Sequence, residues 1–260
     1  MPKSKYQEIY NDIKNKIETS VYDYENMLPS ENELIQVYDC SRNTLRRALS
    51  LLTSEGYIQP IHGRGVRVIY TPKKRQNLTS NTIEGLNQVA SKNGFKVTNN
   101  VITFTEMEID ERLAAKTDFE LNTKVYFIQR LRYLDGVAKM VDNTLLRKDL
   151  VPGLTREILK GSLFQYIEND VGMYIRTIKR CVTVERATPF DEKYLDLDDF
   201  NCLAVITSHV FNNDGIQFEY TESRNRPDIF AFDSVITKNP QQQDYIKQDT
   251  VEMNDKSKEK

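Results

Sequence analysis

The chain has 260 residues, of which 39% are hydrophobic and 28% are charged, and its formal net charge at pH 7 is −2. At roughly 100 to 200 residues per domain, this length favours two domains that each bury a core, and the composition excludes a fully disordered chain. No run of about 18 uninterrupted apolar residues occurs, and no apolar stretch follows the basic residues near the N-terminus. The sequence therefore argues against a membrane protein and predicts a cytoplasmic one.

Cysteine and histidine usage argues against disulfide and metal chemistry. The three cysteines, Cys40, Cys181 and Cys202, are odd in number and widely spaced, which suits a reducing compartment. The two histidines, His62 and His209, are not accompanied by a Cys-x-x-Cys pair. The sequence therefore predicts no metal and no cofactor.

Two helical patterns open the chain. Apolar residues recur at helical spacing over residues 4–19, which predicts a first helix with one buried face. Ser30 and Glu33 precede another apolar stretch at the spacing of a capping box, in which each side chain accepts from the backbone amide of the other residue. A short second helix is therefore expected to begin after Ser30 and to end near Tyr38.

A third helix is expected to follow Ser41, because serine is a favourable N-cap residue. Its buried face is formed by Leu45, Ala48, Leu49 and Leu52. In a helix–turn–helix the start of this helix enters the major groove, where arginine and asparagine contact base edges. The residues in those positions are Ser41, Arg42, Asn43, Thr44 and Arg46.

A β-hairpin is expected next, with strands over residues 57–61 and 66–70 and a tight turn between them. Gly63 and Gly65 in this turn let the backbone approach a phosphate or the minor groove closely. His62 and Arg64 supply hydrogen-bond donors at the same place. The hairpin is thus predicted to be the wing of a winged helix–turn–helix.

Charge is concentrated over this part of the chain. From Cys40 to Arg75, eight basic residues face the single acidic residue Glu55, which gives a local net charge of +7 in a chain that is acidic overall. A concentrated positive surface of this kind favours a polyanionic partner. The sequence therefore predicts that residues 1–70 bind double-stranded DNA.

A polar, proline-containing stretch at residues 71–81 is interpreted as a linker, and residues 238–260 as a flexible tail. Between them, 82–237 is predicted to be an α+β domain around an antiparallel sheet. Its sequence favours two type I′ hairpins, at Asp135-Gly136 and Asp214-Gly215. Short helical patterns lie near residues 82–93, 109–117, 162–171 and 191–197.

The second domain contains a candidate anion pocket. Arg130 and Arg132 are two residues apart on a predicted strand, so both guanidinium groups are expected on one face, where they suit a phosphate. Ser162 begins a predicted helix, whose free amides favour an anion. The paired strand contributes Asp142, and the last hairpin contributes Glu222, as acceptors for sugar hydroxyls. The pattern thus predicts a sugar-phosphate site rather than a catalytic one.

The first domain resembles the DNA-binding domain of the GntR family of repressors. The segments that carry the resemblance are 28–34 (LPSENEL), 41–49 (SRNTLRRAL), 56–58 (GYI) and 62–65 (HGRG). It implies DNA contacts from the start of the second helix, from the third helix and from the wing, which adds Asn32 and Gly63 to the residues above. Asn32 stands where the family often has arginine.

The second domain resembles the UTRA effector domain of the HutC subfamily, whose fold is similar to chorismate lyase. The matching segments are 125–133 (VYFIQRLRY), 153–155 (GLT), 162–167 (SLFQYI) and 220–232 (YTESRNRPDIFAF). The resemblance implies that Arg130, Arg132 and Ser162 bind phosphate and that Asp142, Tyr220 and Glu222 bind the sugar. Gly85 occupies a place where a phosphate-binding serine is expected.

Within this subfamily the chain most resembles repressors of trehalose operons in Gram-positive bacteria, through segments 152–158 (PGLTREI) and 218–226 (FEYTESRNR). This implies a homodimer on a palindromic operator, released by trehalose 6-phosphate, and not an enzyme. Two alternatives stay open: a repressor of the same architecture that senses glucosamine 6-phosphate or N-acetylglucosamine 6-phosphate, and a lyase-like enzyme with a DNA-binding appendage.

Overall fold

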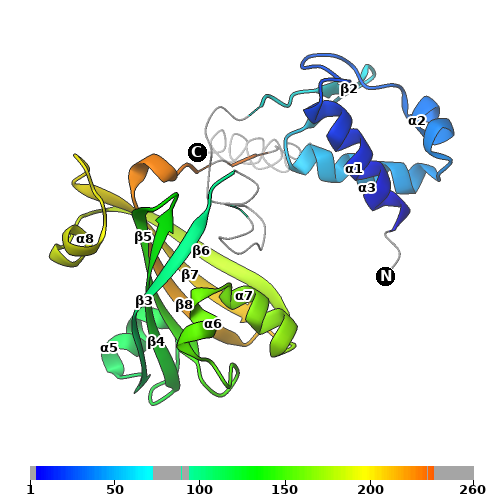
Figure 1. The fold of residues 1–260 in the computed structure, drawn as a ribbon. Coiled ribbons are helices and arrows are strands. Elements are labelled where there is room, and N and C mark those ends of the chain that lie inside the picture. Colours follow the sequence, from blue (N-terminus) through cyan, green and yellow to red (C-terminus); the bar gives the residue numbers. More distant parts are fainter. Residues whose placement is uncertain (1–3, 73–88, 90–93, 233, 237–260) are drawn as a thin grey trace, which may run out of the picture. The chain divides into compact units, whose positions relative to one another are not determined.

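The computed structural model describes residues 4–72, 89, 94–232 and 234–236 (Figure 1). The chain divides into two compact units, one of Met1–Lys74 with Asp233–Lys260 and one of Arg75–Phe232. Most of the expected linker at 71–81, the helical pattern near 82–93 and the expected tail at 238–260 lie outside the described residues. Among the described helices, none is both long and apolar enough to cross a membrane.

The first unit contains the predicted helices and hairpin. They are α1 (Lys5–Glu18), α2 (Glu31–Tyr38), α3 (Arg42–Ser54), β1 (Ile58–Ile61) and β2 (Gly65–Val68). The apolar face of α1 packs against that of α3, as the helical spacing predicted, and β1 closes the same core. The fully buried residues there include Ile9, Ile13, Leu34, Leu45, Leu52 and Ile58.

Local side-chain contacts set where α2 and α3 begin. The capping box at Ser30 is present, since Glu33 accepts from the Ser30 amide at 2.8 Å and Ser30 Oγ accepts from the Glu33 amide at 3.3 Å. Ser41 Oγ accepts from the Thr44 amide at 3.2 Å at the start of α3. Between the helices, Asp39 takes a left-handed conformation with φ 44°, which reverses the chain in a short turn.

The hairpin β1–β2 is antiparallel, with Ile58 opposite Val68. Its turn uses left-handed backbone at Gly63, where φ is 68°, a conformation that glycine adopts without strain. Met27 forms an isolated β-bridge with Arg67, so the segment before α2 is also paired with β2. The wing is therefore attached to the helical core on two sides.

The second unit is built on a six-stranded antiparallel sheet in the order β3-β4-β5-β8-β7-β6. The strands are β3 (Val97–Glu108), β4 (Lys124–Leu134), β5 (Val137–Arg147), β6 (Ile175–Arg186), β7 (Cys202–Asn212) and β8 (Gln217–Asn225). Both Asp-Gly segments join antiparallel neighbours, since β4 pairs with β5 and β7 pairs with β8. The predicted type I′ turn is present at Asp135-Gly136, where both residues have a positive φ, but not at Asp214-Gly215, where only the glycine has one.

Helices cover both faces of this sheet (Figure 1). One face packs against α6 (Arg156–Lys160) and α7 (Leu163–Gln165), which continues as a π-helical turn, and is called the α6/α7 face. The other packs against α5 (Glu111–Thr117) and α8 (Pro189–Tyr194) and is called the α5/α8 face. The expected helices near 109–117, 162–171 and 191–197 are thus present with shifted ends, whereas α6 was not expected.

Strand register decides which residues share a face, because residues directly opposite in an antiparallel pair point to the same side. Arg130 lies opposite Asp142, and Asp142 lies opposite Ser223. One step along, Asn143 lies opposite Glu222. Residues Arg130, Asp142 and Ser223 therefore form one row on the α6/α7 face, and Asn143 and Glu222 belong to the α5/α8 face.

Candidate functional site

The first turns of α2 and α3 form one polar surface in the first unit. Arg42 Nη2 donates to Asn32 Oδ1 at 3.3 Å, and Arg46 forms an ion pair with Glu31 at 3.2 Å. Asn43 is exposed beside them. Because exposed ion pairs contribute little free energy, a DNA phosphate or base edge can compete for these arginines.

The other basic residues of this unit are placed differently. Arg47 is turned to α1, where its guanidinium carbon lies 3.9 Å from the centre of the Tyr6 ring, so it does not belong to the α2–α3 surface. At the wing, His62, Gly63 and Arg64 are exposed in the turn, as predicted from the sequence. Exposed positive charge is therefore present both at the start of α3 and at the tip of the wing.

In the second unit, a buried cluster of charged residues lies on the α6/α7 face of the sheet. Arg132 Nε donates to Asp142 Oδ2, and Ser223 Oγ donates to Asp142 Oδ1 at 2.6 Å. Arg130 Nη2 lies 3.8 Å from the same carboxylate. The exposed fractions of Arg130, Arg132 and Asp142 are 3%, 9% and 4%. Two positive charges thus share one carboxylate away from solvent.

Arg130 is incompletely paired. Its Nε and Nη1 atoms are buried and have no hydrogen-bond partner among the described residues. Burial lowers the pKa of Arg130 to about 10, and the nearby charge of Arg132 adds to the effect. Buried guanidinium nitrogens in native proteins are nearly always satisfied, so these two are candidate donors to a ligand.

The pKa values of two carboxyl groups in the cluster are shifted in opposite directions. Burial would raise the pKa of Asp142, but Arg132 and Arg130 bring it below its usual value, so this group stays ionised. Burial raises the pKa of Glu219, whose Oε1 accepts from Thr221 Oγ1 at 2.6 Å and whose Oε2 has no partner among the described residues. The cluster therefore contains one firmly ionised acceptor and one carboxyl that is inclined to hold a proton.

Ser162 is tied to this cluster through Asn99. Arg132 Nη1 donates to Asn99 Oδ1 at 3.1 Å, and Asn99 Nδ2 donates to the carbonyl of Lys160 at 2.9 Å. Asn99 also reaches the Gly161 carbonyl, directly before Ser162. Ser162 itself caps α7 by accepting from the Gln165 amide at 3.4 Å. The structure thus links the expected phosphate-binding residues Arg130, Arg132 and Ser162 to one region.

Tyr220 and Glu222 are not part of this cluster, and the expectation of a single pocket is wrong for both. They lie on the α5/α8 face, where Lys116 Nζ of α5 is 2.6 Å from Glu222 Oε2 and Tyr220 packs into the core beneath α5. The reason is strand alternation, since Asp142 lies opposite Ser223 and the residues on either side of Ser223 point away.

Sequence reasoning also missed three members of the cluster, namely Asn99, Glu219 and Ser223. Glu219 and Ser223 alternate with Tyr220 and Glu222 along β8, so the segment offers two sets of polar residues. The strand pattern identifies the two sets, but the register of β8 against β5 selects between them. Asn99 carries no local signal, because its role depends on β3 lying beside β4.

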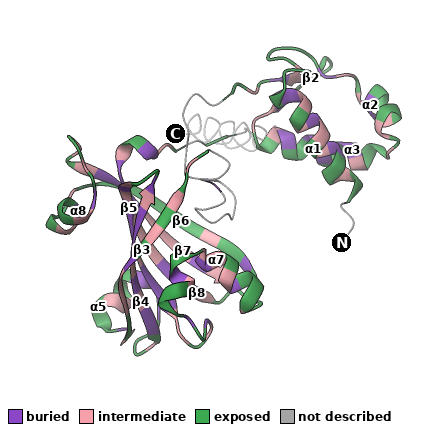
Figure 2. Ribbon diagram, viewed as in Figure 1, coloured by how far each residue is buried: buried purple, intermediate pink, exposed green. Residues whose placement is uncertain are grey.

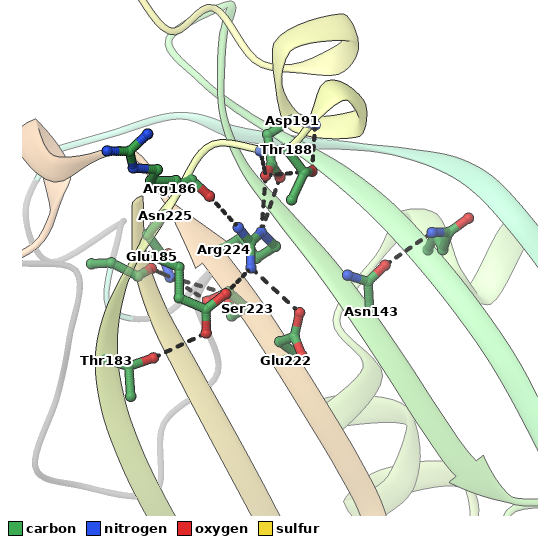
Figure 3. Close-up of polar contacts among 12 residues, drawn as sticks. Asn143, Thr183, Glu185, Arg186, Thr188, Asp191, Glu222, Ser223, Arg224 and Asn225 are labelled. Atoms are coloured by element: carbon green, nitrogen blue, oxygen red, sulfur yellow. Dashed lines mark hydrogen bonds and ion pairs between the residues drawn. The ribbon is translucent and has the colours of Figure 1, made fainter. Parts of the chain in front are cut away.

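A second buried arginine organises the α5/α8 face (Figure 3). Arg224 Nε donates to both Asp191 oxygens at 3.1 Å, and its Nη1 donates to Glu185 at 2.7 Å. Its Nη2 donates to the Arg186 carbonyl at 3.2 Å. Unlike Arg130, this guanidinium has each nitrogen paired, which marks it as a structural connection between β8, β6 and α8.

Two protein families match this chain. Residues 5–68 match the family described as bacterial regulatory proteins, gntR family. Residues 92–231 match the UTRA domain. The two matches coincide with the winged helix–turn–helix and with the six-stranded sheet and its helices.

Individual relatives agree with these matches. The chain is 33% identical over 232 residues to the transcriptional regulator TreR of Bacillus subtilis, covering 89% of this chain and 97% of TreR. The crystal structure of the regulator YydK of B. subtilis superposes with a TM-score of 0.72 at 25% identity, covering 91% of this chain and 100% of that one. The effector-binding domain of the B. subtilis trehalose repressor gives 0.50 at 29% identity, covering 55% and 99%.

Proposed function

Because this chain belongs to the GntR family of bacterial regulatory proteins and carries a UTRA domain, we propose that it represses trehalose-utilisation genes and is released from its operator by trehalose 6-phosphate. The identity to TreR and the likeness to a trehalose repressor's effector-binding domain support the choice of sugar. The choice of a phosphorylated ligand rests on the pocket itself.

The incomplete pairing of Arg130 is the observation that carries the proposal. A buried arginine with two donors that have no partner in the described part of the chain, beside a second arginine, suits a doubly charged phosphate, which accepts bidentate hydrogen bonds from guanidinium groups. In this assignment Arg130, Arg132 and Ser162 bind the phosphate. Asp142, with Glu219 on the same face, accepts hydrogen bonds from sugar hydroxyls.

DNA binding is assigned to the α2–α3 surface and the wing. Residues at the start of α3 read base edges in the major groove, and the wing tip binds phosphate or the minor groove. The assigned residues are Asn32, Ser41, Arg42, Asn43, Thr44, Arg46, His62, Gly63 and Arg64. One such module reads few base pairs, so the functional form is a homodimer on a palindromic operator.

The test measures ligand and operator binding on the same preparation. Trehalose 6-phosphate at about 100 times its dissociation constant is expected to stabilise the protein by about 2.7 kcal/mol in thermal unfolding, and to release operator DNA in a gel shift. Free trehalose and inorganic phosphate serve as controls for each half of the ligand. A response to glucosamine 6-phosphate or N-acetylglucosamine 6-phosphate alone would transfer the assignment to that sugar.

A variant of Arg130 tests whether the response to ligand can be lost while operator binding is kept. Arg130→Lys keeps the positive charge but removes the bidentate geometry, so operator binding is expected to persist while the response to ligand falls at least tenfold. Arg112→Lys, in α5, is the control for a conservative change outside the pocket. A normal response of the Arg130→Lys protein to every phosphosugar would place the effector site elsewhere.

A further inference from the structure

The first unit is made from two segments of the chain, Met1–Lys74 and Asp233–Lys260, and the second unit is made from the residues between them. The chain therefore passes between the two units twice. The described residues of the first unit nearest to these passages are 70–72 on the outgoing side and 234–236 on the returning side. The contacts of these segments within the first unit are thus a direct route by which the second unit can act on it.

The outgoing segment is packed on Tyr57, the residue directly before β1. The rings of Tyr57 and Tyr70 are stacked, with their centres 4.7 Å apart and an interplanar angle of 2°. The amides of Ile69 and Tyr70 donate to the Tyr57 carbonyl at 2.9 and 3.2 Å. Since 71–72 follow at once, the position of the outgoing chain is fixed by Tyr57.

The returning segment is packed on Gly56, the neighbour of Tyr57. A Cβ at position 56 would lie 2.9 Å from Val235 Cγ2 and 3.7 Å from Val235 Cβ, so the valine occupies the space that a side chain would need. Gly56 also has φ 76°, a conformation that favours glycine. Val235 is 49% exposed, whereas the next residue, Ile236, is 90% exposed. Of these two apolar residues, Val235 is therefore the one that docks.

Both passages thus meet the first unit at adjacent residues, where α3 ends and β1 begins. Glu55, Gly56 and Tyr57 are called the α3–β1 corner. Lys14 of α1 holds this corner, since its Nζ donates to Glu55 Oε2 at 2.9 Å and lies 4.9 Å from the centre of the Tyr57 ring. The helices α1 and α3 are each buried along one face and exposed elsewhere (Figure 2). The corner therefore joins the helical core to the wing.

At its other end, the returning segment is continuous with the strand that borders the proposed phosphate pocket. Ser223 of β8 donates to Asp142 at 2.6 Å. Directly after β8, Arg226 forms an ion pair with Asp228 at 2.7 Å. Val235 follows Ser223 by only twelve residues. The pocket and the α3–β1 corner are thus joined by a short covalent path.

We propose that the α3–β1 corner is the docking surface for the chain's own segment 234–236, and that docking there controls DNA binding. With Val235 and Tyr70 in place, the angle between α3 and the β1–β2 hairpin is fixed. DNA binding uses the start of α3 and the tip of this hairpin together, so a fixed angle lowers the entropy lost on binding. The docked state favours the operator, and a ligand that displaces β8 favours the undocked state. For the identity of that ligand, the inference rests on the proposed function.

The size of the contact suits a switch. Because Val235 remains 49% exposed, docking removes little apolar surface from water and contributes a small free energy. A ligand can shift an equilibrium only by its differential affinity for the two states, so a weak contact is one that a ligand can reverse.

Val235→Asp tests the docking without any ligand. A carboxylate at this position loses the apolar contact with Gly56 and adds negative charge next to Glu55, so operator binding is expected to weaken about tenfold in fluorescence anisotropy. Ile236→Asp is the matched control, because it adds the same charge at an exposed neighbour, and its operator binding is expected to stay within about twofold of wild type. Thermal unfolding shows whether both proteins are folded. Equal operator binding by the two variants would overturn the proposal.

A disulfide tests the switch from the other side, by locking the docked state. Since the Cβ positions of residues 56 and 235 are 3.7 Å apart, Gly56→Cys combined with Val235→Cys has the spacing of a disulfide. The native cysteines are replaced by serine in this protein, at Cys40, Cys181 and Cys202. The oxidised form is expected to keep operator DNA at a trehalose 6-phosphate concentration that releases the wild type, and to release it after reduction. Failure to form the disulfide, or equal release from the oxidised and reduced forms, would contradict the docking.

These measurements distinguish the inference from the proposed function. If trehalose 6-phosphate leaves the wild type on its operator while Val235→Asp still binds operator more weakly than Ile236→Asp, the ligand assignment fails and the docking stands. If trehalose 6-phosphate releases the wild type but Val235→Asp binds operator as tightly as Ile236→Asp, the docking fails and the function stands.

Discussion

Arg130 and Arg224 are both buried arginines of the same sheet, but they differ in pairing. Arg224 uses all its nitrogens on protein acceptors, whereas Arg130 leaves two donors unpartnered among the described residues. Removing a guanidinium from water without compensation is unfavourable, which is why we propose that a ligand completes the pairing of Arg130. The two arginines therefore differ at the level of single side chains: Arg224 has a structural role, and Arg130 is the one proposed to bind a ligand.

Glu219→Gln provides a pH test of the pocket. Because burial raises the pKa of Glu219 in the folded state, the wild type loses stability as pH rises from the unfolded value of about 4.3 through the raised folded value. Glutamine does not titrate and keeps an acceptor for Thr221. The melting temperature of the variant relative to wild type is therefore expected to rise between pH 4 and pH 8. A difference that is constant over this range would contradict the assignment.

Arg42→Ala provides a test of base reading. If Arg42 contacts a base edge, its loss weakens operator binding by about 1 to 3 kcal/mol and reduces the preference over random duplex. Arg47→Ala is the matched control, because Arg47 lies over the Tyr6 ring and away from this surface. Fluorescence anisotropy on operator and random DNA measures both quantities. Equal losses on the two duplexes for Arg42→Ala would assign it to phosphate contact.

Among the elements, α8 depends most directly on a single side chain. Asp191 is completely buried, caps α8 through Thr188 and accepts both hydrogen bonds from Arg224 Nε. Arg224 in turn reaches Glu185 on the edge strand β6. One ion network therefore fixes the helix, the centre of the sheet and its edge relative to one another.

Asp191→Asn is expected to destabilise the second unit by about 3 kcal/mol, because breaking a buried ion pair leaves the remaining charge uncompensated. Urea unfolding followed by circular dichroism measures this loss. Asp149→Asn is the control, since Asp149 pairs with Arg147 at the surface and its side chain is 56% exposed. A change within about 0.5 kcal/mol is expected there. Similar effects of the two substitutions would show that the Arg224 network is not a structural centre.

At the scale of the whole molecule, one unit carries the DNA surface and the other the effector pocket. For the proposed release of the operator by a ligand, ligand and operator must favour different states of the protein. A ligand shifts this equilibrium only by its differential affinity for the two states, and a 100-fold difference corresponds to about 2.7 kcal/mol. This coupling free energy links ligand binding to operator binding in both directions.

This linkage predicts reciprocity. If saturating trehalose 6-phosphate weakens operator binding 100-fold, saturating operator must weaken binding of the sugar phosphate by the same factor. Isothermal titration of the ligand in the presence and absence of operator DNA measures the second factor, and anisotropy measures the first. Ligand affinity that is unaffected by operator would exclude allosteric release as the mechanism.

Sequence alone determined the features that depend on neighbouring residues. The serines that begin α2 and α3, the apolar stripes of the helices and the Asp135-Gly136 turn specify local structure through contacts within a few residues, and the structure contains each of them. The alternation of Arg130 and Arg132 along one strand is equally local. These features were sufficient to predict a winged helix–turn–helix and an α+β domain with an antiparallel sheet.

Tertiary structure decided what each strand faces. A shift of one residue in the pairing of β5 with β8 exchanges the two faces of β8, and no local signal fixes that shift. The observed register places Ser223 and Glu219 with the arginines and places Tyr220 and Glu222 under α5. Strand order likewise leaves β6 at an edge. Such pairings join residues far apart in the chain, so their energies depend on the whole core, which no short segment contains.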